Sequence, residues 1–304
     1  MILPGAIEQT ITAMHGEAGR AWLDDLPRRV AGYARRWQLT MMPPFGNLSF
    51  NYAAPGLRAD GIPVVLKICY PGPEVQTEMA ALRIAGGNGM VRLLAKDVAG
   101  ATMLLQRAVP GDMLIDHPDD EAATQIAAGV MVASWRTAPE DHPFPTVAGW
   151  GRGFERMRAR FDGGTGPLPA DLTGRAERLF ADLVASSPAP VVLHGDLHHY
   201  NILRDADGWL AIDPKGVAGE PAYEIGALMR NRLPAMADEA AGLEVLVRRL
   251  RIVAGVTGLD PERMRQWTVA QALLSAWWTI EDGGDIASTE DVIRTAEILE
   301  RVTL

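Results

Sequence analysis

Three polar side chains near the middle of the chain have the types and spacing of a phosphoryl-transfer site. Asp196 follows a run of apolar residues, Asn201 comes five residues later, and Asp213 ends a second apolar run. Mg²⁺ takes hard oxygen ligands and keeps several waters, so one carboxylate and one amide suffice when phosphates supply further oxygens. The spacing predicts that Asn201 and Asp213 hold Mg²⁺, and that Asp196 accepts the proton of an attacking hydroxyl or orients its oxygen. The alternative for Asp196 is a turn residue that caps its loop.

A lysine inside an apolar run fits the same chemistry. Lys67 lies in the segment 64–68, and a charge in a buried strand is unfavourable unless it is paired. Glu74 and Glu78 share one face of the helix predicted after this strand. We favour Glu78 as the partner, because a favourable position in the first helical turn already explains Glu74. Donor phosphates would be a second partner, and the alternative is an edge-strand lysine whose ammonium reaches solvent.

Two further segments are candidates for nucleotide binding. The first is a loop whose backbone amides and short side chains could cover phosphates; it contains Gly46, Asn47 and Ser49. The second ends a predicted strand just before a linker, where main-chain groups could contact adenine; it consists of Gln106, Arg107 and Ala108.

Other catalytic classes fit the sequence less well. His194, His198 and His199 cluster, but no partner set of Cys or His residues accompanies them, which disfavours a zinc site. We expect His194 to orient the loop or fill the core, and the other two to lie at the surface. A serine hydrolase is disfavoured because the chain has no G-x-S-x-G elbow. The single cysteine, Cys69, is predicted to be a strand core residue in a reducing compartment.

The elements that position these residues fall into two groups. Helical segments over 6–37, broken at Gly16 and Pro27, precede the order strand, strand, helix, strand, strand up to Arg107. This order excludes a doubly wound parallel sheet, in which helices alternate with strands. Helices are then predicted over 119–137, 148–161, 170–186, 240–256, 261–280 and 289–302, and only the region 191–213 looks like strands. We therefore predict an α+β protein with a β-rich lobe over 1–108 and a helical lobe over 109–304, joined by a linker at 109–112.

Charge and composition limit the partners. The net charge is −9 over 304 residues, which disfavours a nucleic-acid surface and favours a cationic small molecule. No segment approaches the roughly 20 apolar residues that span a membrane, and no signal peptide is evident, so we expect a cytoplasmic protein. Glu220 and Glu224 follow the predicted metal ligand and, with acidic residues in 281–285, could bind guanidinium or ammonium groups of an acceptor. Capping and solvent-exposed roles are the alternative for all of them.

Taken together, these motifs resemble the aminoglycoside phosphotransferases of the protein-kinase-like fold, and among them the streptomycin 6-phosphotransferase and hydroxyurea phosphotransferase group. The most specific feature is Asp-Pro-Lys-Gly at 213–216, in place of the Asp-Phe-Gly of protein kinases. The resemblance implies a bilobal fold and ATP-dependent phosphorylation of a small-molecule hydroxyl, with Asp196 as base and Asn201 and Asp213 as magnesium ligands. Gln106 departs from the pattern, because a Glu is expected there. The resemblance rests on segments 65–67, 104–111, 194–203, 209–216, 219–224 and 228–231.

The acceptor stays open at this point, because the same catalytic motif serves many acceptors. The leading hypothesis is an aminoglycoside kinase acting on a compound such as streptomycin. A second is a metabolic or hydroxyurea-type kinase of the same fold, and a third is a nucleotide-binding pseudokinase. A protein kinase is disfavoured because no Ala-Pro-Glu segment follows Asp213.

Overall fold

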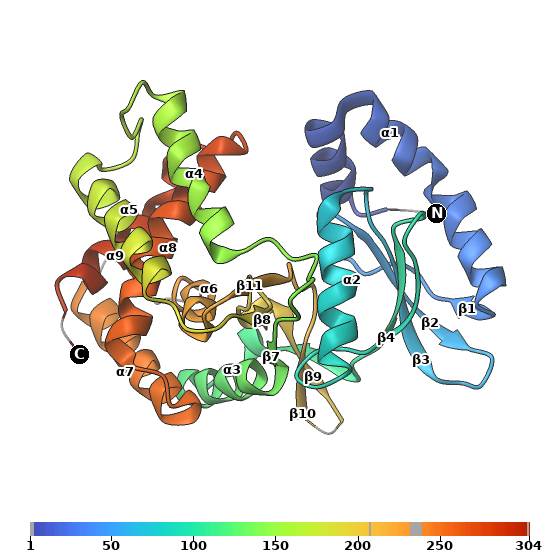
Figure 1. Cartoon of the computed structure of the whole chain (residues 1–304). Coiled ribbons are helices and arrows are strands. Elements are labelled where there is room, and N and C mark those ends of the chain that lie inside the picture. Colours follow the sequence, from blue (N-terminus) through green and yellow to red (C-terminus); the bar gives the residue numbers. More distant parts are fainter. Residues whose placement is uncertain (1–2, 207, 232–238, 303) are drawn as a thin grey trace.

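The first part of the chain folds around an antiparallel sheet (Figure 1). The computed structural model describes residues 3–206, 208–231, 239–302 and 304. The strand order in this sheet is β1-β2-β3-β5-β4, and every neighbouring pair is antiparallel, as the predicted hairpins require. The strands are β1 (Leu39–Met41), β2 (Tyr52–Arg58), β3 (Pro63–Ile68), β4 (Leu93–Asp97) and β5 (Thr102–Gln106).

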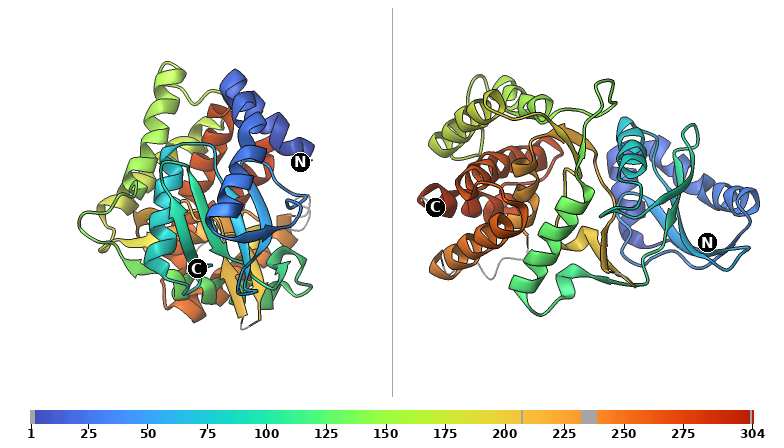
Figure 2. Two further views of the ribbon diagram at one scale, coloured as in Figure 1. Left: turned by 90° about the vertical axis from the view of Figure 1, so that its right-hand side faces the viewer. Right: turned by 60° about the horizontal axis from the view of Figure 1, so that its bottom comes forward.

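The two faces of this sheet are covered by different helices, α1 (Gly5–Arg36) and α2 (Pro73–Ala85) (Figure 2). Leu66 and Ile68 of β3 share one buried cluster with residues of α1. Because side chains alternate along a strand, Lys67 points to the opposite face, where α2 lies. The alternation of side chains therefore directs Lys67 toward α2, the helix that carries the predicted partner Glu78.

The long first helix departs from prediction at one of the two expected breaks. Gly16 is a kink, with φ 57° and ψ −131°, as its sequence signal indicated. Pro27 lies inside the helix instead of ending it. A proline removes one intrahelical hydrogen bond, and the burial of Leu26 next to it, with Ile7 and Ile11 in the same helix, supplies packing that offsets this loss.

The second part of the chain is mostly helical, as predicted, and lies beside the first (Figure 1). Its helices are α3 (Asp120–Ser134), α4 (Val147–Arg160), α5 (Ala170–Ala185), α6 (Ile225–Met229), α7 (Glu239–Thr257), α8 (Pro261–Glu281) and α9 (Glu290–Glu300). Short 3₁₀ turns cover Leu114–Asp116, His199–Asn201, Pro221–Glu224 and Ala287–Thr289.

Two small sheets in this part correct the expectation that only 191–213 forms strands. They have the orders β10-β9-β6 and β11-β8-β7. All six of their strands are only two to four residues long, too short for a sequence period, and the three outside 191–213 are defined only by pairing with β8 and β9. The predicted linker is mostly one of them, β6. The strands are β6 (Pro110–Met113), β7 (Arg136–Thr137), β8 (Val191–Leu193), β9 (Ile202–Asp205), β10 (Gly208–Ala211) and β11 (Val217–Gly219).

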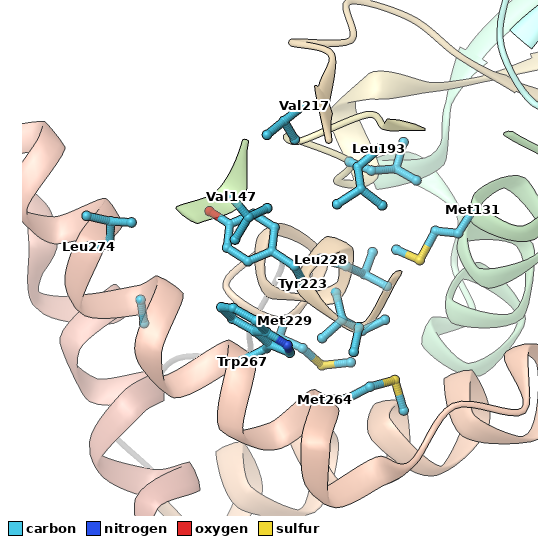
Figure 3. Packing of buried hydrophobic residues seen from close by; sticks show 14 of the residues in the cluster. Met131, Val147, Leu193, Val217, Tyr223, Leu228, Met229, Met264, Trp267 and Leu274 are labelled. Atoms are coloured by element: carbon cyan, nitrogen blue, oxygen red, sulfur yellow. The ribbon is translucent and has the colours of Figure 1, made fainter. Parts of the chain in front are cut away.

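The core of the second part lies directly beneath the strands that carry the predicted site (Figure 3). Leu193 of β8 and Val217 of β11 are fully buried in it with Tyr223 and Trp267. Because Leu193 and Val217 flank the two polar segments 194–201 and 213–216, packing fixes where these segments begin and end. Trp277 of α8 belongs to the same core and is 1% exposed.

Direct backbone pairing connects the two parts. Ala211 at the end of β10 exchanges hydrogen bonds with the segment before β4: it donates to Gly89 O at 2.8 Å and accepts from Val91 N–H at 2.9 Å. The change from one sheet to the other falls between Gln106 and Pro110, next to the division predicted after Ala108. The segment ending at Asp213 is therefore attached to both parts.

Candidate active site

A hairpin brings the two predicted metal ligands together. In the β9–β10 ladder Ile202 pairs with Ala211, and the next step of the ladder is Ile212 N–H donating to Asn201 O at 2.9 Å. Asn201 therefore lies beside the residue that precedes Asp213. The Asn201 amide nitrogen donates to Asp196 O at 3.0 Å, which directs its oxygen away from that bond. An amide oxygen and the half-exposed Asp213 carboxylate are donors that suit Mg²⁺.

The loop that carries Asp196 needs a glycine at its start. Gly195 has φ 84°, and a Cβ there would meet Trp150 at 2.8 Å and Val217 at 3.0 Å. The Asp196 side chain is 40% exposed, and its Oδ2 lies 3.7 Å from His198 Nε2. An accessible carboxylate on a loop with fixed backbone is the geometry that a base or acceptor-orienting group needs.

His194 connects this loop to the metal-ligand hairpin. The side chain is fully buried, and its Nδ1 accepts from Asp196 N–H at 3.2 Å, so the proton is assigned to Nε2, which donates to Ile212 O at 2.8 Å. Burial lowers the pKa of His194 to about 4, so the ring is neutral at pH 7. Both ring nitrogens serve positioning, in agreement with the predicted orienting role. His199 is fully buried, and the expectation of a surface role for it is wrong. It is the first residue of the 3₁₀ turn His199–Asn201, and its ring is directed into the protein.

Lys67 lies between two carboxylates. Its Nζ is 2.6 Å from Glu78 Oε1 and 3.0 Å from Asp213 Oδ1, with the lysine side chain 4% exposed and that of Glu78 9%. Burial opposes the charge on Lys67, but Asp213 and Glu78 outweigh it and raise its pKa. Burial raises the pKa of Glu78 to about 7, against the lowering effect of Lys67. The geometry agrees with the choice of Glu78, since Glu74 pairs with Lys215 instead.

The predicted phosphate loop lies close to this lysine in the sheet. It connects β1 to β2, with Gly46, Asn47 and Ser49 exposed. Phe45 N–H donates to Ala53 O at 3.1 Å, and Ala53 is opposite Lys67 in the β2–β3 ladder.

The predicted adenine segment leaves the sheet at Gln106. The Gln106 side chain accepts from Arg92 N–H at 3.3 Å and donates to Asp205 Oδ2 at 3.2 Å, while Val109 N–H donates to Asp205 Oδ1 at 3.0 Å. Gln106 thus anchors the segment to β9, a contact with Asp205 that a Glu could not make as a donor. Arg107 and Ala108 lie between the two sheets.

The expectation that Glu220 and Glu224 face an acceptor is wrong in this structure. Glu220 is 4% exposed and forms an ion pair with Arg263, whose Nη2 lies 2.6 Å from Glu220 Oε2. Glu224 is 1% exposed, and its two oxygens accept the N–H groups of His194 at 2.7 Å and Gly195 at 2.8 Å. A buried carboxylate needs such donors, and both residues find them inside the protein. Two of the acidic residues at 281–285 also have partners within the protein: Glu281 pairs with Arg156 at 2.7 Å, and Asp285 accepts from Ser288 N–H.

Comparison with known proteins identifies the family. Residues 47–283 match the family described as aminoglycoside/hydroxyurea antibiotic resistance kinases. The chain belongs to this family. It is 34% identical to a hydroxyurea phosphotransferase of Kitasatospora aureofaciens, over 98% of this chain and 85% of the relative. It is 31% identical to a streptomycin 6-kinase of Streptomyces glaucescens, over 92% of each chain.

Solved structures agree on the fold. An aminoglycoside phosphotransferase in ternary complex with AMP-PNP and hygromycin B superimposes with a TM-score of 0.58 at 18% identity, covering 86% of this chain and 93% of that one. The bilobal α+β kinase fold predicted from the motifs is therefore confirmed.

Some residues of this kinase that support the site were missed or assigned another role in the sequence. Glu224 holds the Asp196 loop through two backbone bonds, and no period or motif indicates such a contact. Thr77 Oγ1 donates to Lys215 O at 2.6 Å and so joins α2 to the segment after Asp213. Lys215 belongs to the Asp-Pro-Lys-Gly segment at 213–216, the most specific motif in the sequence. That motif is the signal from which a role for Lys215 could have been predicted. In the described ranges no group of three or more His, Cys, Asp or Glu side chains is arranged to hold a metal ion. The predicted magnesium ligands are one Asp and one Asn, so they do not form such a group.

Proposed function

We propose that this kinase transfers the γ-phosphoryl group of ATP, in the presence of Mg²⁺, to a hydroxyl of a small cationic acceptor, and that the acceptor is an aminoglycoside such as streptomycin. The observation that carries the proposal is the arrangement of Lys67 between Glu78 and Asp213 beside the Asp196–Asn201 loop. The 31% identity to a streptomycin 6-kinase and the AMP-PNP in the structural relative support the choice of acceptor and donor.

Each residue has a definite part in the transfer. Lys67, fixed by Glu78, contributes a positive charge to the donor phosphates, while Asn201 and Asp213 would hold the metal. Bound Mg²⁺ would neutralise charge on the phosphate oxygens. As the acceptor oxygen forms its bond to phosphorus and the bond to the ADP oxygen breaks, Asp196 receives the hydroxyl proton.

A hydroxyurea-type acceptor is the second candidate. The 34% identity to a hydroxyurea phosphotransferase over almost the whole chain favours it. The acidic net charge of −9 instead favours a cation, because hydroxyurea is neutral. Among the described residues, no helix combines the length and the apolar character that a membrane span needs.

A panel of acceptors read by mass spectrometry tests the proposal. Streptomycin, other aminoglycosides and hydroxyurea are incubated with Mg-ATP, and a product heavier by one phosphoryl group is sought. Asp196→Asn keeps the size of the side chain and should lower turnover at least 100-fold, while Asp60→Asn in an exposed turn serves as the control. Turnover unchanged in Asp196→Asn would remove Asp196 as the base. Mg-ATP binding without a product from any acceptor would support the pseudokinase hypothesis instead.

A further inference from the structure

The rarity of lysine draws attention to one residue that the proposed reaction leaves unused. Of the 29 basic residues in the chain only three are lysines, at positions 67, 96 and 215. Lys96 is exposed on β4, whereas Lys67 and Lys215 both lie at the candidate active site. The chain uses arginine almost everywhere else, so a compact ammonium at these two places points to a different requirement.

The backbone of Lys215 is fixed from both parts of the kinase. Its N–H donates to His194 O at 2.8 Å, and its carbonyl accepts from Thr77 Oγ1 of α2 at 2.6 Å. The next residue, Gly216, has φ 68°, and a Cβ there would lie 2.7 Å from Thr77 O. Close approach of α2 therefore requires this glycine, and the backbone that carries the Lys215 side chain is held in place.

The ammonium of Lys215 has a weak partner and a strongly charged neighbourhood. Its Nζ lies 3.0 Å from Glu74 Oε2, but the two side chains are 46% and 74% exposed, and ion pairs so open to solvent contribute little to stability. Burial lowers the pKa of Lys215, but Glu74 and Asp196 outweigh burial and the opposing charge of Lys67 and raise it, and Lys215 in turn helps to lower the pKa of Asp213. The Lys67–Glu78 pair one helical turn further along α2 is buried by contrast, so the two lysines differ in how easily they exchange partners.

We propose that Lys215 is a further catalytic residue: its ammonium leaves Glu74 and binds the γ-phosphoryl oxygens during transfer. This inference rests on the proposed function. Charge spreads over the three equatorial oxygens as the bond to ADP breaks and the bond to the acceptor forms, and the acceptor proton still goes to Asp196. Lys67 is held between two carboxylates, Glu78 and Asp213, whereas Lys215 has one exposed partner, so the ammonium of Lys215 is the one that can turn toward the γ-phosphoryl oxygens.

Paired variants distinguish phosphate binding by Lys215 from a purely structural role, in which the Lys215–Glu74 ion pair only joins the two parts of the kinase. Lys215→Met and Glu74→Gln break the same ion pair, but only the first removes the ammonium. Lys215→Met should lower kcat about 100-fold, as the loss of one charge-stabilising donor does, while Lys215→Arg recovers part of it. Glu74→Gln should stay within about twofold of wild type, and Lys96→Met is the control for loss of a lysine charge.

Nucleotide affinity gives a readout that needs no acceptor. Calorimetric titration with Mg²⁺ and AMP-PNP should show about tenfold weaker binding in Lys215→Met, whereas ADP binding changes less than twofold, because ADP lacks the γ-phosphoryl group. Equal losses in Lys215→Met and Glu74→Gln, or equal losses for both nucleotides, would overturn the inference while the proposed function stands. A wild-type protein that binds neither nucleotide would overturn both.

Discussion

Replacement of Glu224 by glutamine should raise stability and lower activity at the same time. Glu224 is 1% exposed, and burial raises its pKa from 4.5 to about 7 even though the N–H groups of Gly195 and His194 lower it. In the unfolded chain this carboxyl titrates near 4.5. Between pH 4.5 and 7 the folded state therefore binds a proton that the unfolded state does not, and the contribution of Glu224 to the free energy of unfolding falls as pH rises.

The size of this effect follows from the pKa change. One pKa unit corresponds to about 1.4 kcal/mol, so the interval from 4.5 to about 7 corresponds to about 3 kcal/mol. At pH 5 the protonated Glu224 and the glutamine of Glu224→Gln are both neutral, and the two proteins should agree within about 1 kcal/mol. At pH 8 the variant should be more stable by about 3 kcal/mol, because glutamine has no charge to desolvate.

Activity should change in the opposite direction. The two oxygens of Glu224 accept one N–H group each, and in glutamine one of these positions becomes an NH₂ group that faces an N–H group. The loop before Asp196 must shift, and a displacement of about 1 Å costs about 100-fold in rate. We therefore expect kcat at pH 8 to fall between tenfold and 100-fold.

Urea unfolding at pH 5, 6, 7 and 8, together with kcat at pH 8, measures both effects. Glu177→Gln, which breaks a partly exposed ion pair with Arg158, is the control for loss of a glutamate charge elsewhere. Parallel stability curves for wild type and Glu224→Gln across this pH range would refute the account of burial. An unchanged kcat would refute the positioning of the loop by Glu224.

Three further outcomes follow from the geometry. Lys67→Met leaves Glu78 buried without its cation and should lower the free energy of unfolding by about 3–5 kcal/mol in urea titrations. Addition of Glu78→Gln to this variant should restore stability but not turnover. Asn201→Ala should raise the Mg²⁺ concentration needed for half-maximal turnover at least tenfold, and EDTA should stop the wild type reversibly; an unchanged Mg²⁺ titration would remove this residue as a ligand. Gly216→Ala should lower Tm more than Gly61→Ala, because both have positive φ but only at Gly216 does a Cβ collide with α2; equal losses would contradict this.

The grouping of the candidate site residues could be predicted from the sequence because short-range patterns define it. Asn201 and Asp213 lie on one hairpin, and the four-residue spacing of Glu74 and Glu78 places both on one face of α2. Lys67 and Asp213 are 146 residues apart, but the cost of a buried charge already required a partner for Lys67.

Residues whose role depends on tertiary contacts could not be predicted in the same way. Glu220 and Glu224 have the same side chain and lie four residues apart, and sequence alone does not distinguish an exposed carboxylate from one turned inward. The structure turns one toward Arg263 and the other toward the backbone of the Asp196 loop. Strands β6, β7 and β11 were missed for a related reason, since only their pairing partners define them.

The difference between local sequence patterns and tertiary contacts also explains why the type of reaction is easier to predict from the sequence than the acceptor. The groups proposed to handle phosphate are held by backbone hydrogen bonds between segments 194–201 and 212–216, whose local sequence is distinctive. With Glu220 and Glu224 directed inward, the proposed cationic acceptor would have to be attracted by Asp196, which is 40% exposed, and by residues of other segments. Helices of similar amphipathic pattern can present different side chains to an acceptor, so acceptor specificity can change while segments with a proposed role in phosphate transfer stay the same.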